Sequence, residues 1–443
     1  MIRSARCEEA FLNISIPPLV LLAMVAAGCS TATGPTPASA PAAPARAAQT
    51  EKSLPKGTLD PREAQARVHL EVGRAAIARG DMAAATILLR EALRWEPELV
   101  EARESLARAL YGMGDLDAAL DELRGLLRQR PDAVQARLTL ATVLMARQDW
   151  SSARTELEAV LRQQPDLVQA HYNLGAVLYA MRDLNGAIHA YRRGLTHSPN
   201  HPDVRYNLAL LLTVAHRGAE ATPEFLVAAQ AGHARAQYFA GMAYARGFGV
   251  DRDLSLAITW WSRAAERDVG EAQTVLRDLR QTALGRSGRT PTERQAAEQA
   301  FRDHRLALWN EFPELARAGA DDTVGAALLR QGRGREAVRM LIREASAFSE
   351  PAQGLLESLY DHGVQGQLPA HDPRILEYFK TAADEGLVRP RITLARFYAA
   401  GLGVPKDMAR AIDLLKATPH EDAQRLLQEL SAAGEAVPVP TRP

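Results

Sequence analysis

The side chains that could carry chemistry are few and lie far apart along the chain. His197 and His201 are four residues apart, a spacing that could present two imidazoles to a metal ion on one helix face, but Pro199 between them interrupts a helix. The only cysteines, Cys7 and Cys29, lie in the first thirty residues, so we expect no disulfide framework in the rest of the chain. We predict no metal site and no cofactor.

The sequence also lacks the short motifs of common enzymes. It contains no HExxH, no Walker-type phosphate loop and no nucleophile elbow. Gly-x-Gly-Val occurs at 247–250 and 401–404, but both copies stand between helical patterns, so a turn with positive φ explains them better than phosphate binding. The pair Trp260 and Trp261 matches an apolar packing position better than a ligand platform. We therefore predict no catalytic residues and no enzyme.

What the sequence does contain is a repeat of 34 residues between residues 66 and 199. Four prolines keep this period, at Pro97, Pro131, Pro165 and Pro199. So do four aspartates, at Asp81, Asp115, Asp149 and Asp183. Apolar residues at helical spacing flank each aspartate, and Gly or Ala at matching positions would let two helices approach closely. Each period therefore predicts a helix pair, and neighbouring pairs must stack because one pair cannot bury its apolar face alone.

This pattern resembles the tetratricopeptide repeat, which implies an all-α, right-handed α-solenoid. The units fall at about 66–99, 100–133, 134–167 and 168–201, followed by a half-unit at 202–216 where the aspartate turn is missing. A second pattern begins near Ala236, runs through the turn at 247–250, and returns at 391–416. It resembles the Sel-one-like repeat, a longer-looped relative with the same helix-turn-helix plan.

The expected domain organisation follows from these two patterns. Its parts are a tetratricopeptide solenoid at 58–218, a Sel-one-like repeat at 219–282, a helical insertion with a degenerate repeat at 283–350, Sel-one-like repeats with a capping helix at 351–431, and a disordered tail at 432–443.

The N-terminal segment reads as a targeting signal. Residues 1–28 contain a short apolar run that ends in Ala26-Ala27-Gly28, directly before Cys29. Small residues before a cysteine resemble the lipobox of bacterial lipoproteins, in which that cysteine is lipidated. The following residues, 29–57, are rich in Pro and Ala and predict a tether that could extend roughly 80 Å. The resemblance implies an outer-membrane lipoprotein facing the periplasm; a soluble periplasmic protein is the alternative.

The resemblance to tetratricopeptide repeats also implies a peptide-binding groove on the first helix of each unit. Carried over to this sequence, the groove positions are Tyr111, Leu138, Thr142, Met145, Tyr172, Asn173, Tyr179, Tyr206, Asn207 and Leu210. Aromatic rings and side-chain amides suit an extended or helical peptide. The alternative, that Tyr172 and Tyr206 simply pack between units, stays open.

The charge balance narrows the class of partner. The chain has 53 basic and 53 acidic residues, which argues against nucleic acid as a partner because phosphate binding needs a basic surplus. We predict a non-enzymatic scaffold that binds protein partners at a membrane. The array resembles periplasmic scaffold lipoproteins of exopolysaccharide export, such as the one of alginate secretion. The alternatives are a pilus-assembly lipoprotein, or a carbohydrate-binding or hydrolytic envelope protein that uses residues 283–350.

Overall fold

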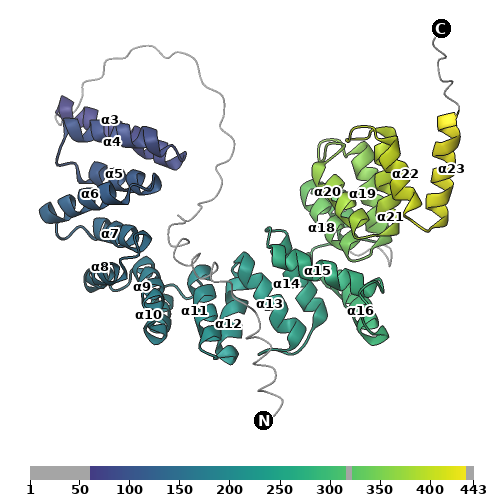
Figure 1. The fold of residues 1–443 in the computed structure, drawn as a ribbon, viewed down its shortest axis with the longest axis horizontal. Coiled ribbons are helices and arrows are strands. Elements are labelled where there is room, and N and C mark those ends of the chain that lie inside the picture. The colour runs from purple at the N-terminus through teal and green to yellow at the C-terminus, as the bar shows by residue number, and fades with distance from the viewer. Residues whose placement is uncertain (1–59, 316–321, 436–443) are drawn as a thin grey trace, which may run out of the picture. The chain divides into compact units, whose positions relative to one another are not determined.

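The computed structural model describes residues 60–315 and 322–435. Within these ranges the regular elements are helices, apart from one isolated β-bridge between Val364 and Leu368 (Figure 1). The prediction of an all-α fold is confirmed. The chain divides into two compact units, the first ending at His233 and the second beginning at Ala234. The predicted signal peptide, Cys29, the tether and most of the predicted C-terminal tail lie outside the described residues.

The described part of the first unit is a row of helix pairs. The pairs are α3 (Pro61–Ala78) with α4 (Met82–Trp95), α5 (Val100–Gly112) with α6 (Leu116–Gln129), α7 (Val134–Ala146) with α8 (Trp150–Gln163), α9 (Val168–Ala180) with α10 (Leu184–His197), and α11 (Pro202–Val214) with α12 (Gly218–Gln230). Each second helix also packs against the first helix of the next pair. The helices from α3 to α9 therefore share one continuous apolar core that runs from Leu70 to Val177, as a solenoid requires.

The same turn joins the two helices in each of the first four pairs. Asp81 accepts a hydrogen bond from the backbone N–H of Ala84 at 3.0 Å and so caps the second helix. The same bond recurs at Asp115, Asp149 and Asp183. The residue just before the cap position has a φ between 58° and 81° in every pair, at Gly80, Gly114, Gln148, Arg182 and His216. The periodic aspartates are therefore helix caps.

A glycine at the centre of two first helices allows the close approach within a pair. A Cβ atom added to Gly175 would lie 2.5 Å from the ring of Tyr191, and one added to Gly73 would lie 2.8 Å from Leu89. The large apolar residue of the second helix thus fills the space that the missing side chain leaves. A side chain at either glycine would push the two helices apart.

The structure has a complete fifth helix pair where the sequence predicted only a half-unit at 202–216. Although no aspartate caps it and Arg217 makes no side-chain cap bond, α12 follows directly and packs on α11. Phe225 of α12 is 1% exposed, and its ring lies 6.0 Å from that of Tyr206. Burial of this ring outweighs the loss of a cap, which is worth about 1 kcal/mol. The first unit therefore extends beyond residue 218.

The second unit is less regular. Its described elements are α13 (Ala234–Arg246), α14 (Leu254–Ala265), α15 (Gly270–Ala283), α16 (Pro291–Leu308), the short 3₁₀ helix η1 (Trp309–Glu311), α17 (Val324–Arg330), α18 (Gly334–Ser346), α19 (Glu350–His362), α20 (Pro373–Asp384), α21 (Val388–Ala400), α22 (Met408–Lys416) and α23 (Glu421–Glu435). Helices that follow one another pack together, and α18 also contacts α20. The apolar core of this unit is divided into separate clusters.

The Gly-x-Gly-Val turns adopt the geometry that the sequence predicted. Gly247, Gly249, Gly401 and Gly403 all have positive φ, between 62° and 73°. Trp261 is 3% exposed and donates from its indole nitrogen to the carbonyl of Tyr238 at 3.2 Å. The packing interpretation of this tryptophan is confirmed.

Candidate functional site

The ten predicted groove residues all lie on first helices, α5, α7, α9 and α11, as the register requires. Three of them are only half-buried, Tyr111, Thr142 and Tyr179. The other seven are at most 7% exposed: Leu138, Met145, Tyr172, Asn173, Tyr206, Asn207 and Leu210. The half-buried residues are therefore the ones with side-chain surface to offer a ligand.

The buried tyrosines and amides of the groove mainly contact one another and their neighbours. Asn207 donates from Nδ2 to the hydroxyl of Tyr172 at 3.0 Å, which joins α11 to α9. Asn173 accepts from Gln169 at 3.0 Å within α9. The ring of Tyr206 stacks on His233 with the centroids 4.1 Å apart. These contacts give the two tyrosines a packing role, while peptide binding by the groove stays a prediction.

The residue type at one groove position changes toward the N-terminus of the array. Glu104 on α5 takes the position that Leu138, Tyr172 and Tyr206 hold on later first helices, and it is half-buried. Burial raises the pKa of Glu104, and the charge of Arg108 opposes this rise. A peptide in the groove would therefore meet charged side chains at α5 and apolar ones from α7 onward.

A ladder of arginines joins successive pairs, and the sequence analysis missed it. Arg103, Arg137 and Arg205 share one register, and each donates to the carbonyl of the proline that precedes its helix. Each also forms an ion pair with a glutamate on the second helix of its own pair: Glu122, Glu156 and Glu224. The 34-residue spacing of the arginines was the signal in the sequence. The prolines thus supply hydrogen-bond acceptors as well as helix ends.

The fourth pair interrupts this ladder. His171 takes the place of the arginine and Ala190 that of the glutamate. The imidazole still donates from Nε2 to the carbonyl of Pro165 at 2.8 Å, and it stacks on His197 with the ring centroids 6.0 Å apart. Burial lowers the pKa of His171, so the ring is neutral at pH 7.

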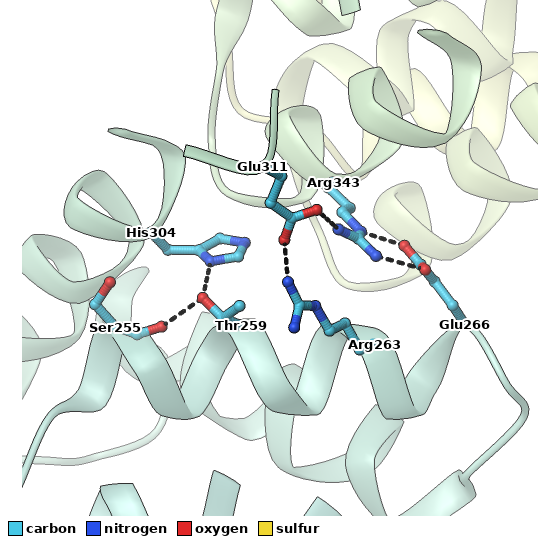
Figure 2. Close-up of polar contacts among 7 residues, drawn as sticks. All are labelled: Ser255, Thr259, Arg263, Glu266, His304, Glu311 and Arg343. Carbon is cyan, nitrogen blue, oxygen red and sulfur yellow. Dashed lines mark hydrogen bonds and ion pairs between the residues drawn. The ribbon is translucent and has the colours of Figure 1, made fainter. Parts of the chain in front are cut away.

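The second unit contains a cluster of charged side chains from helices far apart in sequence (Figure 2). Arg343 of α18 donates to both carboxylate oxygens of Glu266 and, at 3.1 Å, to Glu311. Arg263 of α14 donates to the other oxygen of Glu311 at 2.7 Å. Since the Arg343 side chain is only 9% exposed, these are charge-assisted bonds largely shielded from water. The cluster ties α14, η1 and α18 together.

His304 borders the same cluster. The hydroxyl of Thr259 lies 2.9 Å from His304 Nδ1 and 3.1 Å from the carbonyl oxygen of Ser255, to which it can donate its proton. Figure 2 shows both hydrogen bonds. Burial lowers the pKa of His304 to about 4, and the nearby charge of Arg343 adds to the shift. The imidazole is therefore neutral at pH 7.

A second buried ion pair lies at the end of α20. Arg280 of α15 donates to both carboxylate oxygens of Glu385, at 2.6 and 2.5 Å, and the Glu385 side chain is 6% exposed. Arg286 donates to the backbone carbonyls of Glu385 and Gly386, both at 2.9 Å. These guanidinium groups face the carboxyl end of a helix, where positive charge is favoured. The contacts join residues about 100 positions apart in the chain.

A cavity of about 800 Å³ lies between α14, α15, α16, α18 and α20. Its apolar lining includes Leu276 and Ile342, and the segment 283–350 contributes Phe301 and His304. Glu266 and Glu385 also line it, but each already accepts hydrogen bonds from an arginine. A hydrolytic pair needs one carboxyl group free to give a proton and one free to take it. The cavity therefore offers volume for a small ligand without such a pair at these two positions.

Glu344 is a further buried acid. Its carboxylate accepts from the backbone N–H groups of Val324 at 2.7 Å and Gly325 at 3.2 Å, at the start of α17. The residue is 3% exposed, and burial raises the pKa of Glu344 to about 7. Because both oxygens are engaged by backbone groups, we assign Glu344 a structural role.

Neither a metal site nor a membrane-spanning helix is found among the described residues. No group of three or more His, Cys, Asp or Glu side chains among these residues is arranged to hold a metal ion. Within residues 60–315 and 322–435, no helix combines the length and the apolar character that crossing a bilayer needs.

Comparison with known families identifies both kinds of repeat. The tetratricopeptide repeat model matches residues 76–133, 111–176 and 168–201. The Sel1 repeat model matches residues 234–269 and 394–417. Neither model describes a catalytic domain. A search of curated proteins finds no match to the sequence.

Solved structures with helical repeats resemble part of the chain. MamA (41-end) from Desulfovibrio magneticus RS-1 is 22% identical over 38% of this chain and 94% of its own, with a TM-score of 0.35. PilF of Pseudomonas aeruginosa is 18% identical over 57% of this chain and 95% of its own, with a TM-score of 0.37. The chain is thus all-α and contains tetratricopeptide repeats within 76–201 and Sel1 repeats at 234–269 and 394–417, and these repeats support a role in protein–protein interaction.

Proposed function

We propose that the protein is a lipid-anchored scaffold on the periplasmic face of the bacterial outer membrane. The observation that carries this proposal is Cys29, which directly follows Ala26-Ala27-Gly28 at the end of a short apolar run. Beyond this segment the chain contains tetratricopeptide repeats within 76–201 and Sel1 repeats at 234–269 and 394–417. Lipidation at Cys29 would hold both repeat units at the membrane through the Pro/Ala-rich segment.

The anchor is tested by metabolic labelling with a fatty-acid probe. We expect the native chain to be labelled and to fractionate with outer membranes, and Cys29→Ser to lose both properties. Cys7→Ser is the matched control, because it removes the other cysteine and should change neither. An unlabelled native chain, or equal labelling of the Cys29→Ser variant, would contradict the anchor.

The scaffold acts within an envelope assembly or export machine in this proposal. Its partners are proteins that place a peptide or helix in the groove, and the balance of 53 basic and 53 acidic residues argues against nucleic acid. Polysaccharide export is the pathway we favour, with pilus assembly as the alternative. Crosslinked envelopes should yield components of one of these machines with the native chain.

The groove itself is tested on two of its half-buried residues. Tyr111→Ala with Tyr179→Ala removes surface that a ligand can reach, so we expect at least tenfold weaker partner binding with little change in melting temperature. Tyr172→Ala with Tyr206→Ala should lower the melting temperature as well, because both rings are buried. His189→Ala, an exposed change on a second helix, is the control. Unchanged binding in the Tyr111 and Tyr179 variant would place the partner elsewhere.

A further inference from the structure

The first helix of the described array carries an exposed apolar stripe. Val68, Val72 and Ala75 follow one another at helical spacing on α3, and Arg79 ends the row. Val68 is 55% exposed and Val72 is 45% exposed, although both are β-branched apolar residues. Ala75 and Arg79 are exposed too. We call these four residues the open-end stripe.

The same register positions are buried in every later pair. The residues that take the places of Val68, Val72 and Ala75 are at most 4% exposed in the second, third and fifth pairs: Ala102, Leu106, Ala109, Ala136, Leu140, Val143, Val204, Leu208 and Leu211. In the fourth pair Ala170 and Val177 are fully buried and Leu174 is half-buried. Each of these first helices packs against the second helix of the preceding pair. The open-end stripe is thus the surface on which this repeat places a helix.

We propose that the open-end stripe binds an amphipathic α-helix of a partner protein, which continues the solenoid at its first described pair. A face of this kind is apolar because it is built to be covered, whereas terminal repeats that face solvent are normally polar. The partner helix would bury the two valines as α4, α6 and α8 bury the equivalent residues.

The covering helices within the chain define the chemistry of the partner. Each carries a half-buried leucine near its C-terminal end, at Leu93, Leu127 and Leu161. In addition, Asp117 in the first turn of α6 forms an ion pair at 2.5 Å with Arg147, which holds the register position of Arg79. A partner helix with an acidic first turn and a leucine about three turns later would reproduce both contacts.

Two other occupants fit this chemistry less well. Residues 30–57 contain five prolines and one large apolar residue, Leu54, so they offer no apolar stripe at helical spacing. A second copy of the stripe carries no acid to meet Arg79, so it could not reproduce the ion pair that Asp117 forms with Arg147. The inference rests on the proposed function in one respect, namely that the apolar run before Cys29 is removed with the signal peptide.

The test is site-specific photo-crosslinking in cells that express the full-length protein. A photoreactive amino acid replaces Val72, and the matched control places it at Arg90, an exposed position on α4. We expect a crosslink to another protein from position 72 only, mapped by mass spectrometry to the apolar side of an amphipathic helix. Val68→Glu should abolish the crosslink, and Arg79→Glu should reduce its yield about tenfold. Circular dichroism should be unchanged, since these side chains are exposed.

The other outcomes overturn the inference. They are a crosslink within the same chain, to a second copy, to lipid alone or to a non-helical segment, equal crosslinking from both positions, and no crosslink at all. The Cys29→Ser variant separates this inference from the anchor. If crosslinking at position 72 survives in a chain that no longer fractionates with membranes, the helix-binding stripe stands independently. If labelling of Cys29 is confirmed while position 72 captures no helix, the stripe fails and the anchor stands.

Discussion

The two units of this protein use charged side chains in different ways. In the first unit, Arg103, Arg137 and Arg205 each pair with a glutamate 19 residues away and hold the same position of the 34-residue repeat. In the second unit, Arg343 and Arg280 pair with acids 77 and 105 residues away and have no counterpart at a repeated position. The first pattern is local and periodic, and the second is long-range and follows no period.

The difference shows how stability is distributed in each unit. In the first unit the second, third and fifth pairs each hold their own ion pair, so losing one should weaken one pair and its junction with the pair before it. In the second unit two buried pairs join helices whose apolar cores are separate, so each of them affects the whole unit. Substitutions in each unit test this contrast.

Removing one partner of a buried pair should be the most damaging change. Arg280→Ala leaves the 6% exposed carboxylate of Glu385 without its bidentate partner, and we expect a loss of about 3–5 kcal/mol in the unfolding free energy of the second unit. Hydrogen exchange in α15 and α20 measures it. The double variant Arg280→Met with Glu385→Met should recover most of the loss, because no buried charge remains. A loss below about 1 kcal/mol in Arg280→Ala would show that this ion pair does not stabilise the whole second unit.

Two buried titratable groups in the second unit should have opposite effects on its pH dependence. The pKa of His304 falls from 6.5 to about 4 on folding, so His304 favours the folded state above pH 6.5 and this stability is lost as the pH falls toward 4. The pKa of Glu344 rises from 4.5 to about 7, so its contribution is present below pH 4.5 and is lost as the pH rises toward 7. Each contribution amounts to about 3 kcal/mol at most.

The two effects should nearly cancel between pH 4.5 and 6.5, and variants should separate them. In His304→Gln the second unit should become about 2–3 kcal/mol less stable between pH 5 and pH 7.5 as Glu344 ionises. In Glu344→Gln it should become more stable by a similar amount over the same range. Urea unfolding at the two pH values measures both. Parallel pH profiles for wild type and both variants would show that neither group titrates as stated.

The ladder of the first unit should give smaller, local effects. Arg137→Ala removes an ion pair and a bond to the carbonyl of Pro131, and we expect a loss of about 1 kcal/mol, confined to the second and third helix pairs. His171→Arg with Ala190→Glu restores the ladder at the fourth pair and should gain about 0.5 kcal/mol. Hydrogen exchange along the solenoid locates both effects. A response spread over the whole unit would remove the contrast between the two regions.

The turns should give the smallest effects. Arg182 has a φ of 68°, a region that glycine adopts without strain, so Arg182→Gly should stabilise the first unit by roughly 0.5 kcal/mol. Gly80 has the same role with a φ of 80° and open space around it, so Gly80→Ala should cost about 1 kcal/mol through backbone strain alone. Thermal melts of the matched pair measure the difference. Shifts of the same sign in both variants would contradict this account.

The sequence could predict the helix pairs because their signals are local and repeated. The aspartate caps and the apolar spacing depend on residues within one turn or one pair, so four aspartates in phase were enough to place the turns. It failed at α12, where the cap is missing and the burial of Phe225 against α11 holds the helix instead. A contact with another helix cannot be predicted from the residue pattern of one helix alone.

The same division between local sequence signals and contacts with other helices applies to the candidate site. The register alone put all ten groove residues on first helices, but their exposure depends on what neighbouring helices cover, which left only Tyr111, Thr142 and Tyr179 half-buried. The open-end stripe illustrates the point most directly. Val72 and Leu106 hold the same place in the repeat, and only the presence or absence of a covering helix makes one 45% exposed and the other 1% exposed.

The sequence by itself determined the all-α class, the 34-residue period, the caps and the kind of repeat in each half. These features arise from interactions between residues close together in the chain, and their repetition multiplies a weak signal. Only the tertiary structure decided the network around Arg343, the Arg280–Glu385 pair and the cavity beside them. Those contacts join residues up to 105 positions apart that occur once each, and no period reveals a partner that a side chain meets only in space.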